Sequence, residues 1–368
     1  MLGAIIGDIV GSRFEFANTH RTDFELFADG CNYTDDTICT IAVADALLGR
    51  GDFTASLQAW CRRYPHPKGA YGGRFHQWIY TNPPVPYRSF GNGSAMRVSP
   101  CGWLPTREEV LSQARASAAC THNHPEGIKG AVATADAIYM LRNGMTKKEL
   151  ASHIEANYHY DLSLDVDDIR AHNHFDETCQ VTVPQAFACF LAGRTFEEVI
   201  RLAISIGGDS DTIGAIAGSL AEAYYGVPQA IEEKAWRFLP AEMQAVITAF
   251  RSRYAITKGE LIEQCRYYKG EEENPFDGAD QDKSLFWYYE EMWVNRFKGD
   301  YIDEQMTRVR YLAFPSVANA NKGKLSAVPV SLQLLLFNRY MHWLSGYQSL
   351  EDDVASFVAW LKRVYLGE

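Results

Sequence analysis

The 368-residue sequence lacks several features that would define a broad class of protein. No apolar run approaches the roughly 20 residues that a membrane-spanning helix needs. Its eight cysteines form no Cys-x-x-Cys pair and no zinc-ligand spacing, which predicts reduced thiols. Positive charge is scarce, and the net charge of -11 opposes nonspecific nucleic-acid binding. Together these absences predict a soluble, cytoplasmic protein with no membrane and no nucleic-acid partner.

Alternating strand patterns are almost absent, and helical periodicity dominates. Apolar residues from Ile213 to Tyr224 recur at i, i+3, i+4 and i+7, and similar stripes cover 196–203 and 350–364. The single candidate strand, Val181 to Val183, is closed by Pro184. The apolar N-terminus has no basic leader, so we expect a buried first helix there, not a signal peptide. The fold class predicted is all-α.

A charged, turn-rich connection at 269–278 predicts a domain boundary. We therefore expect one domain over 1–267 and a helical, aromatic-rich module of unknown role over 268–368. The aromatic residues of the module either pack its own core or recognise a partner and set substrate choice.

Two acidic segments with the same spacing precede apolar helical stripes. Each combines carboxylates and hydroxyls, and either could serve only as a helix cap. Four carboxylates gathered in one pocket would instead repel one another unless cations neutralised them. Their oxygen donors favour magnesium, calcium or manganese over zinc. The segments are Tyr33-Thr34-Asp35-Asp36-Thr37 and Gly207-Gly208-Asp209-Ser210-Asp211-Thr212.

Three further features have two interpretations each. The segment from Gly91 to Arg97 is either a glycine-rich turn or a loop that surrounds a phosphate. His122 either holds a turn or faces a ligand. Gly3, Gly7 and Gly11, spaced four apart, permit close helix packing, and the following Glu15 lies either on the surface or toward the metal pocket.

In this order, these motifs resemble those of the ADP-ribosylglycohydrolase family over about residues 1–250. The resemblance implies an orthogonal helical bundle of the ADP-ribosylglycohydrolase type, with two Mg²⁺ ions for which Mn²⁺ could substitute. Tyr71 to Phe75 and Trp78 match a family loop near the cleft entrance more loosely. The metal ligands implied are Thr34, Asp35, Asp36, Asp209, Asp211 and Thr212. The substrate-binding residues implied are Gly91, Asn92, Gly93, Ser94, Met96 and His122.

The activity implied is hydrolysis of the glycosidic bond to ADP-ribose. The substrate would be an ADP-ribosylated protein or a small ADP-ribose conjugate, and the sequence favours neither. In the mechanism expected from this, water would attack C1″ of the distal ribose, and Glu15 or Asp36 would assist proton transfer. The alternative is a non-catalytic ADP-ribose-binding or structural protein of the same fold.

Overall fold

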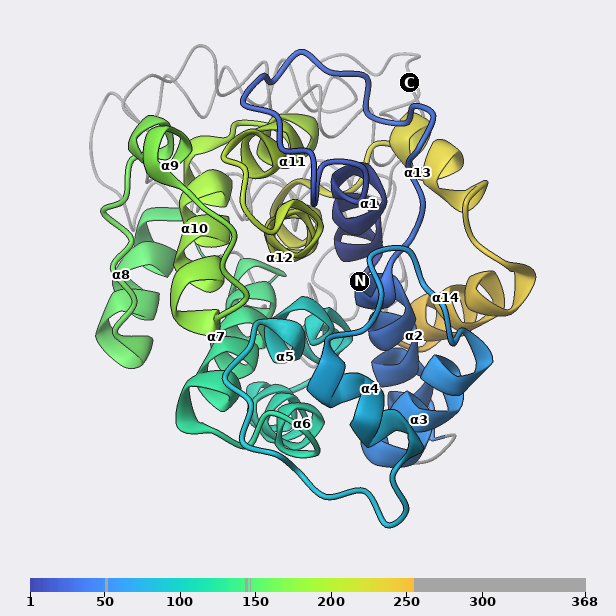
Figure 1. Cartoon of the computed structure of the whole chain (residues 1–368). Helices are drawn as coiled ribbons and strands as arrows, with labels where there is room; N and C mark the ends of the chain where they lie inside the picture. Colours follow the sequence, from blue (N-terminus) through green and yellow to red (C-terminus); the bar gives the residue numbers. More distant parts are fainter. Residues whose placement is uncertain (50–51, 143–144, 146, 255–368) are drawn as a thin grey trace, which may run out of the picture. The chain divides into compact units, whose positions relative to one another are not determined.

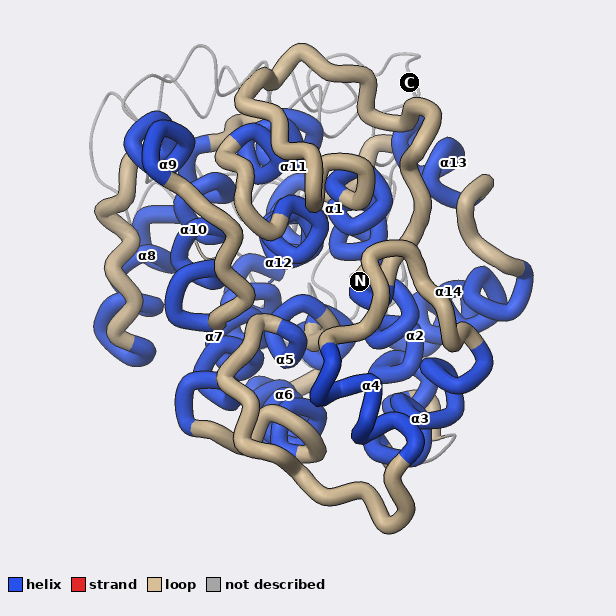
Figure 2. Tube along the Cα trace, in the orientation of Figure 1, coloured by secondary structure: helices blue, strands red, loops and turns tan. Residues whose placement is uncertain are grey.

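The structure is a computed structural model that describes residues 1–49, 52–142, 145 and 147–254. Within these residues every regular element is a helix (Figure 1, Figure 2), and β pairing is limited to two isolated bridges. The all-α prediction is confirmed, whereas the predicted 268–368 module and the stripe at 350–364 lie outside the described residues. The helices are α1 (Leu2–Gly11), α2 (Asp35–Leu47), α3 (Phe53–Arg63), α4 (Gly73–Tyr80), α5 (Gly93–Met96), the 3-10 helix η1 (Ser99–Trp103), α6 (Arg107–Ala119), α7 (Pro125–Arg142), α8 (Lys147–Tyr158), α9 (Val166–His172), α10 (Cys179–Ala192), α11 (Phe196–Ser205), α12 (Ser210–Tyr225), α13 (Gln229–Trp236) and α14 (Ala241–Tyr254).

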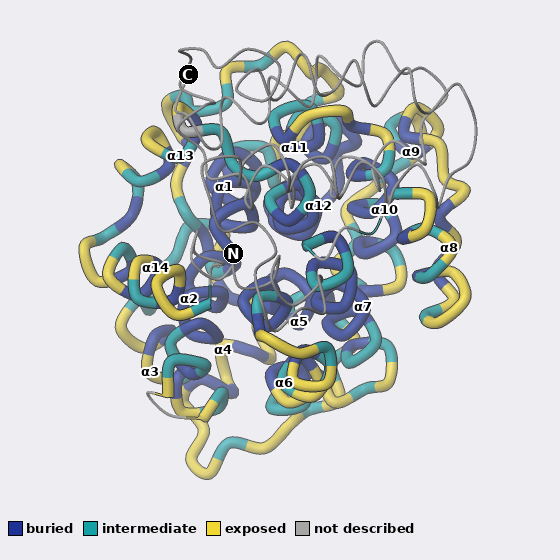
Figure 3. The backbone as a smooth tube through the Cα atoms, turned by 180° about the vertical axis from the view of Figure 1, so that it is seen from behind, coloured by how far each residue is buried: buried dark blue, intermediate teal, exposed yellow. Residues whose placement is uncertain are grey.

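Helices α1 and α12 pack against each other at the centre of the described residues (Figure 1), and most of their residues are coloured as buried in Figure 3. Their glycines face one another. A Cβ added to Gly7 would lie 1.9 Å from the carbonyl oxygen of Gly214, and one added to Gly3 would lie 2.1 Å from that of Gly218. The backbones of the two helices therefore touch, as the four-residue glycine spacing predicted.

The burial and the C-terminal end of α12 follow from its sequence. Its predicted apolar stripe is buried from Ile213 to Ala221, and the helix is followed by Gly226, whose φ of +72° favours glycine. The candidate strand from Val181 to Val183 is wrong, because these residues lie inside α10, where the N–H of Thr182 donates to the carbonyl of Thr178 at 2.9 Å. Packing against α7, α11 and α12 outweighs their local strand preference.

Two negative findings apply to the described part of the chain. None of its helices has the length and apolar character to cross a bilayer. Its seven cysteines are free thiols, which agrees with the absence of paired spacings in the sequence.

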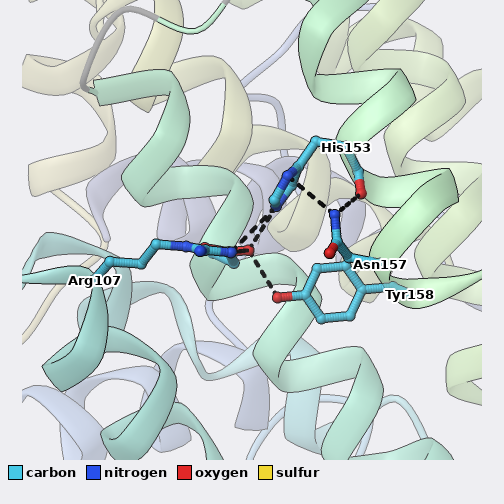
Figure 4. A network of polar contacts seen from close by, with 5 residues as sticks. Arg107, His153, Asn157 and Tyr158 are labelled. Atoms are coloured by element: carbon cyan, nitrogen blue, oxygen red, sulfur yellow. Dashed lines mark hydrogen bonds and ion pairs between the residues drawn. The ribbon is translucent and has the colours of Figure 1, made fainter.

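A buried polar network joins the start of α6, the middle of α7 and the end of α8 (Figure 4). Asp136 of α7 is fully buried and accepts hydrogen bonds from Arg107 Nε at 2.7 Å, His153 Nε2 at 2.8 Å and the Tyr158 hydroxyl at 2.7 Å. Asn157 in turn donates to the backbone carbonyl of His153 at 2.8 Å. One carboxylate thus fixes three helices to one another.

We expect Asp136→Asn to lower the free energy of unfolding by about 2 kcal/mol, less than for a fully buried pair because the Arg107 side chain is 41% exposed. Burial alone would raise the pKa of Asp136, but the hydrogen bonds from Arg107, His153 and Tyr158 lower it overall. The stabilisation is therefore present above the unfolded-state pKa of about 4 and is lost as the pH falls through the folded-state value.

Urea denaturation at neutral and at acidic pH measures this effect. The difference in the free energy of unfolding between wild type and Asp136→Asn should become smaller as the pH falls. Asp168→Asn, a change at an exposed position of α9, should leave the free energy of unfolding near that of wild type. A difference that does not change with pH would show that the charge of Asp136 is not what stabilises the junction.

Candidate active site

The first acidic segment is fixed by Asp8 near the end of α1. This buried carboxylate accepts hydrogen bonds from the backbone N–H groups of Thr34 and Thr37, each at 3.0 Å, and from both hydroxyls. Thr34 also caps α2, because its side chain accepts from the N–H of Asp36. Asp8 therefore orients the first turn of α2, which carries Asp35 and Asp36.

The second acidic segment begins with a glycine turn before α12. Gly207 and Gly208 have φ values of +73° and +74°, which a side chain would strain. The amide of Asn18 donates to the carbonyl of Gly208 and accepts from its N–H, both at 2.9 Å. Asn173 donates to the carbonyl of Gly207 at 3.0 Å. Two side chains thus hold the turn that presents Asp209.

The two acidic segments meet in one cavity of about 430 Å³. The hydroxyl of Thr212 lies 3.3 Å from Asp36 Oδ2, and the amide of Asn92 donates to Asp209 Oδ2 at 2.6 Å. The close glycine contacts between α1 and α12 help to bring the two acidic segments together, because Asp8 of α1 holds the first segment and α12 begins within the second. The loop from Tyr71 to Phe75 also lines the cavity, whereas Trp78 does not. The predicted metal-ligand, catalytic and substrate-binding residues that line it are Glu15, Asp35, Asp36, Gly91, Asn92, Gly93, Met96, His122, Asp209, Asp211 and Thr212.

The carboxylates of the cavity are costly to ionise together. Burial first, and then the charge of Asp211, raise the pKa of Asp36 and of Asp209 well above the usual range. Burial and Asp211 also raise the pKa of Asp8 to about 7, although hydrogen bonds from Thr37 and Thr34 oppose the shift. The cavity therefore favours either protonated carboxyls or a bound cation.

Glu15 lies on the loop after α1. Burial raises its pKa to about 8, with smaller contributions from Asp211, Asp8 and Glu177. A Cβ added to Gly69, whose φ is +80°, would lie 2.6 Å from Glu15 Oε2. The backbone at Gly69 leaves room for this carboxyl, which can hold or release a proton near neutral pH.

The cavity contains buried carboxylate oxygens of the kind that bind a divalent cation. Asp36 Oδ1, Asp211 Oδ1 and Glu15 Oε2 are buried and accept no hydrogen bond from the described residues. Oxygen donors of this kind suit Mg²⁺ or Mn²⁺. Across the described ranges, however, no three histidine, cysteine or acidic side chains already stand in a coordinating geometry. The hydroxyl of Thr212, which lines the same cavity, is a further oxygen donor, so the chemistry of the donor set suits a divalent cation.

Two of the predicted ligand residues do not line the cavity, and the guanidinium of Arg97, which does, is held by other protein groups. Thr34 and Ser94 are fully buried, and the Ser94 hydroxyl donates to the carbonyl of Gly127 at 2.7 Å. Arg97 lines the cavity, but its Nη2 donates to the carbonyl of Ser117 and the hydroxyl of Thr121, both at 2.8 Å. The ligand roles of Thr34 and Ser94 therefore stay predictions.

His122 is buried, and burial followed by the charge of Arg97 lowers its pKa well below the usual range. Its Nδ1 lies 2.7 Å from the hydroxyl of Thr121. A neutral imidazole next to the Gly91 to Met96 segment can donate or accept one hydrogen bond, but it does not supply a positive charge.

Sequence reasoning missed several groups at the cavity. Asp8 does not itself line the cavity, and no local pattern indicated that it accepts four hydrogen bonds. Phe16, Tyr87, Phe175 and Glu177 also line the cavity. The only sequence signal for Phe16 was its position next to Glu15.

The chain is similar to several known proteins. The model of the ADP-ribosylglycohydrolase family matches residues 1–260. The ADP-ribosylarginine hydrolase Tri1 of Pseudomonas putida is 25% identical over 277 residues, which cover 64% of this chain and 73% of that protein. The ADP-ribosyl-[dinitrogen reductase] glycohydrolase of Rhodospirillum rubrum is 28% identical over 257 residues, covering 61% of this chain and 84% of that protein.

The likeness extends to a mammalian relative and to a solved structure. The ADP-ribosylhydrolase ARH3 of Mus musculus is 28% identical over 313 residues, which cover 63% of this chain and 84% of that protein. A structure described as an ADP-ribosylglycohydrolase-related protein complex superposes with a TM-score of 0.52 and 26% identity, over 68% of this chain and 95% of that one. Because the family model covers well over half of its residues, the chain belongs to the ADP-ribosylglycohydrolase family.

Proposed function

We propose that this ADP-ribosylglycohydrolase depends on magnesium and hydrolyses the glycosidic bond between ADP-ribose and a protein side chain or small acceptor. One observation carries the proposal: two acidic helix starts, far apart in the chain, share a cavity in which buried carboxylate oxygens have no hydrogen-bond partner among the described residues. The names of the relatives support it, since they describe hydrolases that act on ADP-ribosylated arginine or dinitrogen reductase.

Two Mg²⁺ ions would be held by Asp35 and Asp36 of α2 on one side, and on the other by Asp209, which precedes α12, and Asp211 and Thr212 of α12. Thr34 is a further predicted ligand. When bound, they would supply positive charge and Lewis acidity to a site that is otherwise strongly acidic. Mn²⁺ has similar ligand preferences and is expected to substitute.

The residues of the chain would then perform the hydrolysis. Water forms a bond to C1″ of the distal ribose, the bond from C1″ to the acceptor breaks, and the proton lost by water returns to the acceptor. Glu15 or Asp36 takes that proton, and adjacent carboxylates stabilise positive charge on the ribose in the transition state. Asn92 keeps Asp209 in place through its 2.6 Å hydrogen bond.

A panel of defined conjugates tests the proposal. We expect the full chain to release ADP-ribose from at least one of an arginine conjugate, a serine conjugate and a small ADP-ribose ester when Mg²⁺ is present. A chelator should abolish the release, and added Mg²⁺ should restore it.

Two different results would contradict parts of the proposal. If ADP-ribose is released equally fast in chelator, the magnesium dependence is contradicted, but the hydrolase activity is not. Tight calorimetric binding of ADP-ribose without turnover of any conjugate would favour a non-catalytic binding protein of the same fold.

A further inference from the structure

Two phenylalanines from distant loops stack at the cavity. The ring centroids of Phe16 and Phe175 are 6.1 Å apart and their planes are inclined by 28°. Phe16 is 75% exposed and Phe175 is 44% exposed. Among the exposed large hydrophobic side chains of the described residues, these are the two that line the cavity. Aromatic surface left in water beside a binding site is typical of a contact made by the ligand.

Carboxylates accompany this aromatic pair. Glu15 precedes Phe16 in the chain, Glu177 lies two residues after Phe175, and both glutamates line the cavity. The charge of Glu177 contributes to the raised pKa of Glu15, so the two carboxyls are within electrostatic reach. The nearby cation, Lys68, donates to the carbonyl of Gly30 and does not line the cavity. This part of the wall is therefore aromatic and acidic.

The two arginines that line the cavity, Arg74 and Arg97, lie near Tyr87 and not near the aromatic pair. Arg74 donates to the carbonyl of Tyr87, and its guanidinium lies 4.8 Å from the centre of the Tyr87 ring. The charges of Arg97 and Arg74 both act on the Tyr87 hydroxyl. The cavity wall thus has a basic part and an acidic, aromatic part.

ADP-ribose is negative at its diphosphate, and the acceptor is attached at the opposite end of the distal ribose. A basic wall suits the diphosphate. A planar cation suits the other wall, because it can stack on an exposed aromatic ring and pair with a carboxylate at the same time. A guanidinium meets both requirements, whereas a serine side chain is neither planar nor charged.

We infer that Phe16, Phe175 and Glu177 form the acceptor subsite and that it takes the guanidinium of an ADP-ribosylated arginine. The inference rests on the proposed function. It makes these residues determinants of acceptor choice, distinct from the carboxylates that would hold the metal.

Three variants test the subsite: Phe16→Ala, Glu177→Gln and the control Tyr80→Ala, which changes an exposed aromatic residue of α4 outside the cavity. The measurements are kcat/KM on arginine and serine conjugates and the calorimetric Kd of ADP-ribose, which has no acceptor. We expect Phe16→Ala and Glu177→Gln each to lower kcat/KM on the arginine conjugate about tenfold. The Kd of ADP-ribose and kcat/KM on the serine conjugate should change less than about twofold, and Tyr80→Ala should match wild type.

The inference is overturned if Phe16→Ala weakens ADP-ribose binding as much as it lowers kcat/KM, since the aromatic pair would then contact the adenosine. Equal losses on the two conjugates also overturn it. If wild type hydrolyses neither conjugate, the proposed function fails separately, and calorimetry still tests the subsite. In that case the arginine conjugate should bind more tightly than ADP-ribose, and Phe16→Ala should remove the difference; no difference in wild type would reject the subsite.

Discussion

Asp211→Ala is expected to lower the rate of magnesium-dependent ADP-ribose release by about a thousandfold or more, and Asp35→Ala should have a comparable effect. Both carboxylates line the shared cavity, one from each acidic segment. Removal of either would take away one of the carboxylates that are proposed to hold the divalent cations. A single-turnover assay at saturating Mg²⁺ measures the chemical step directly.

The same variants should not unfold the protein. Burial raises the pKa of Asp211, so its ionisation above the unfolded-state pKa opposes folding when no cation is bound. In chelator we therefore expect Asp211→Ala to be as stable as wild type or more stable, as is common where function keeps like charges together. Asp168→Ala, at an exposed position of α9, should leave the rate unchanged. If both cavity variants are folded and retain the wild-type rate, the metal-site hypothesis fails.

Gly7→Ala is expected to lower the free energy of unfolding by about 3 kcal/mol. The added Cβ would lie 1.9 Å from the carbonyl oxygen of Gly214, which is backbone and cannot rotate away. Helices α1 and α12 would have to separate, and this would displace Asp8 and Asp211 along with them. Activity should therefore fall together with stability.

Guanidinium denaturation in chelator provides the measurement. Gly73→Ala is the matched control, because a Cβ at this helical position has no atom within 4 Å, and we expect a change of less than about 1 kcal/mol. If Gly7→Ala stays within that range as well, the close contact between the two helices does not limit stability.

Much of the fold could be predicted because its signals are local. The apolar stripe from Ile213 predicted α12, and the glycine spacing at Gly3 and Gly7 predicted its close packing with α1. The threonine cap of α2 was likewise visible in the sequence. Local signals failed at Val181, where burial in α10 outweighs strand propensity.

The site was predicted less completely, because its geometry depends on contacts between distant segments. The acidic segments could be recognised as a pair, yet nothing in the sequence indicated that Asp8 holds Thr34 or that Asn18 holds Gly208. The stacking of Phe16 on Phe175 joins two loops that have no motif in common. Such partners appear only once the chain has folded.

The meeting of Asp36 with Thr212, 176 positions later, has a consequence for biosynthesis. The α2 carboxylates leave the ribosome long before α12 exists, and α1 lacks its main packing partner over the same interval. Because contacts of this sequence separation form late, the nascent chain gains the full set of proposed cation ligands only after Thr212 has been synthesised. A ribosome-bound chain truncated before residue 209 should consequently neither retain divalent ions nor turn over substrate.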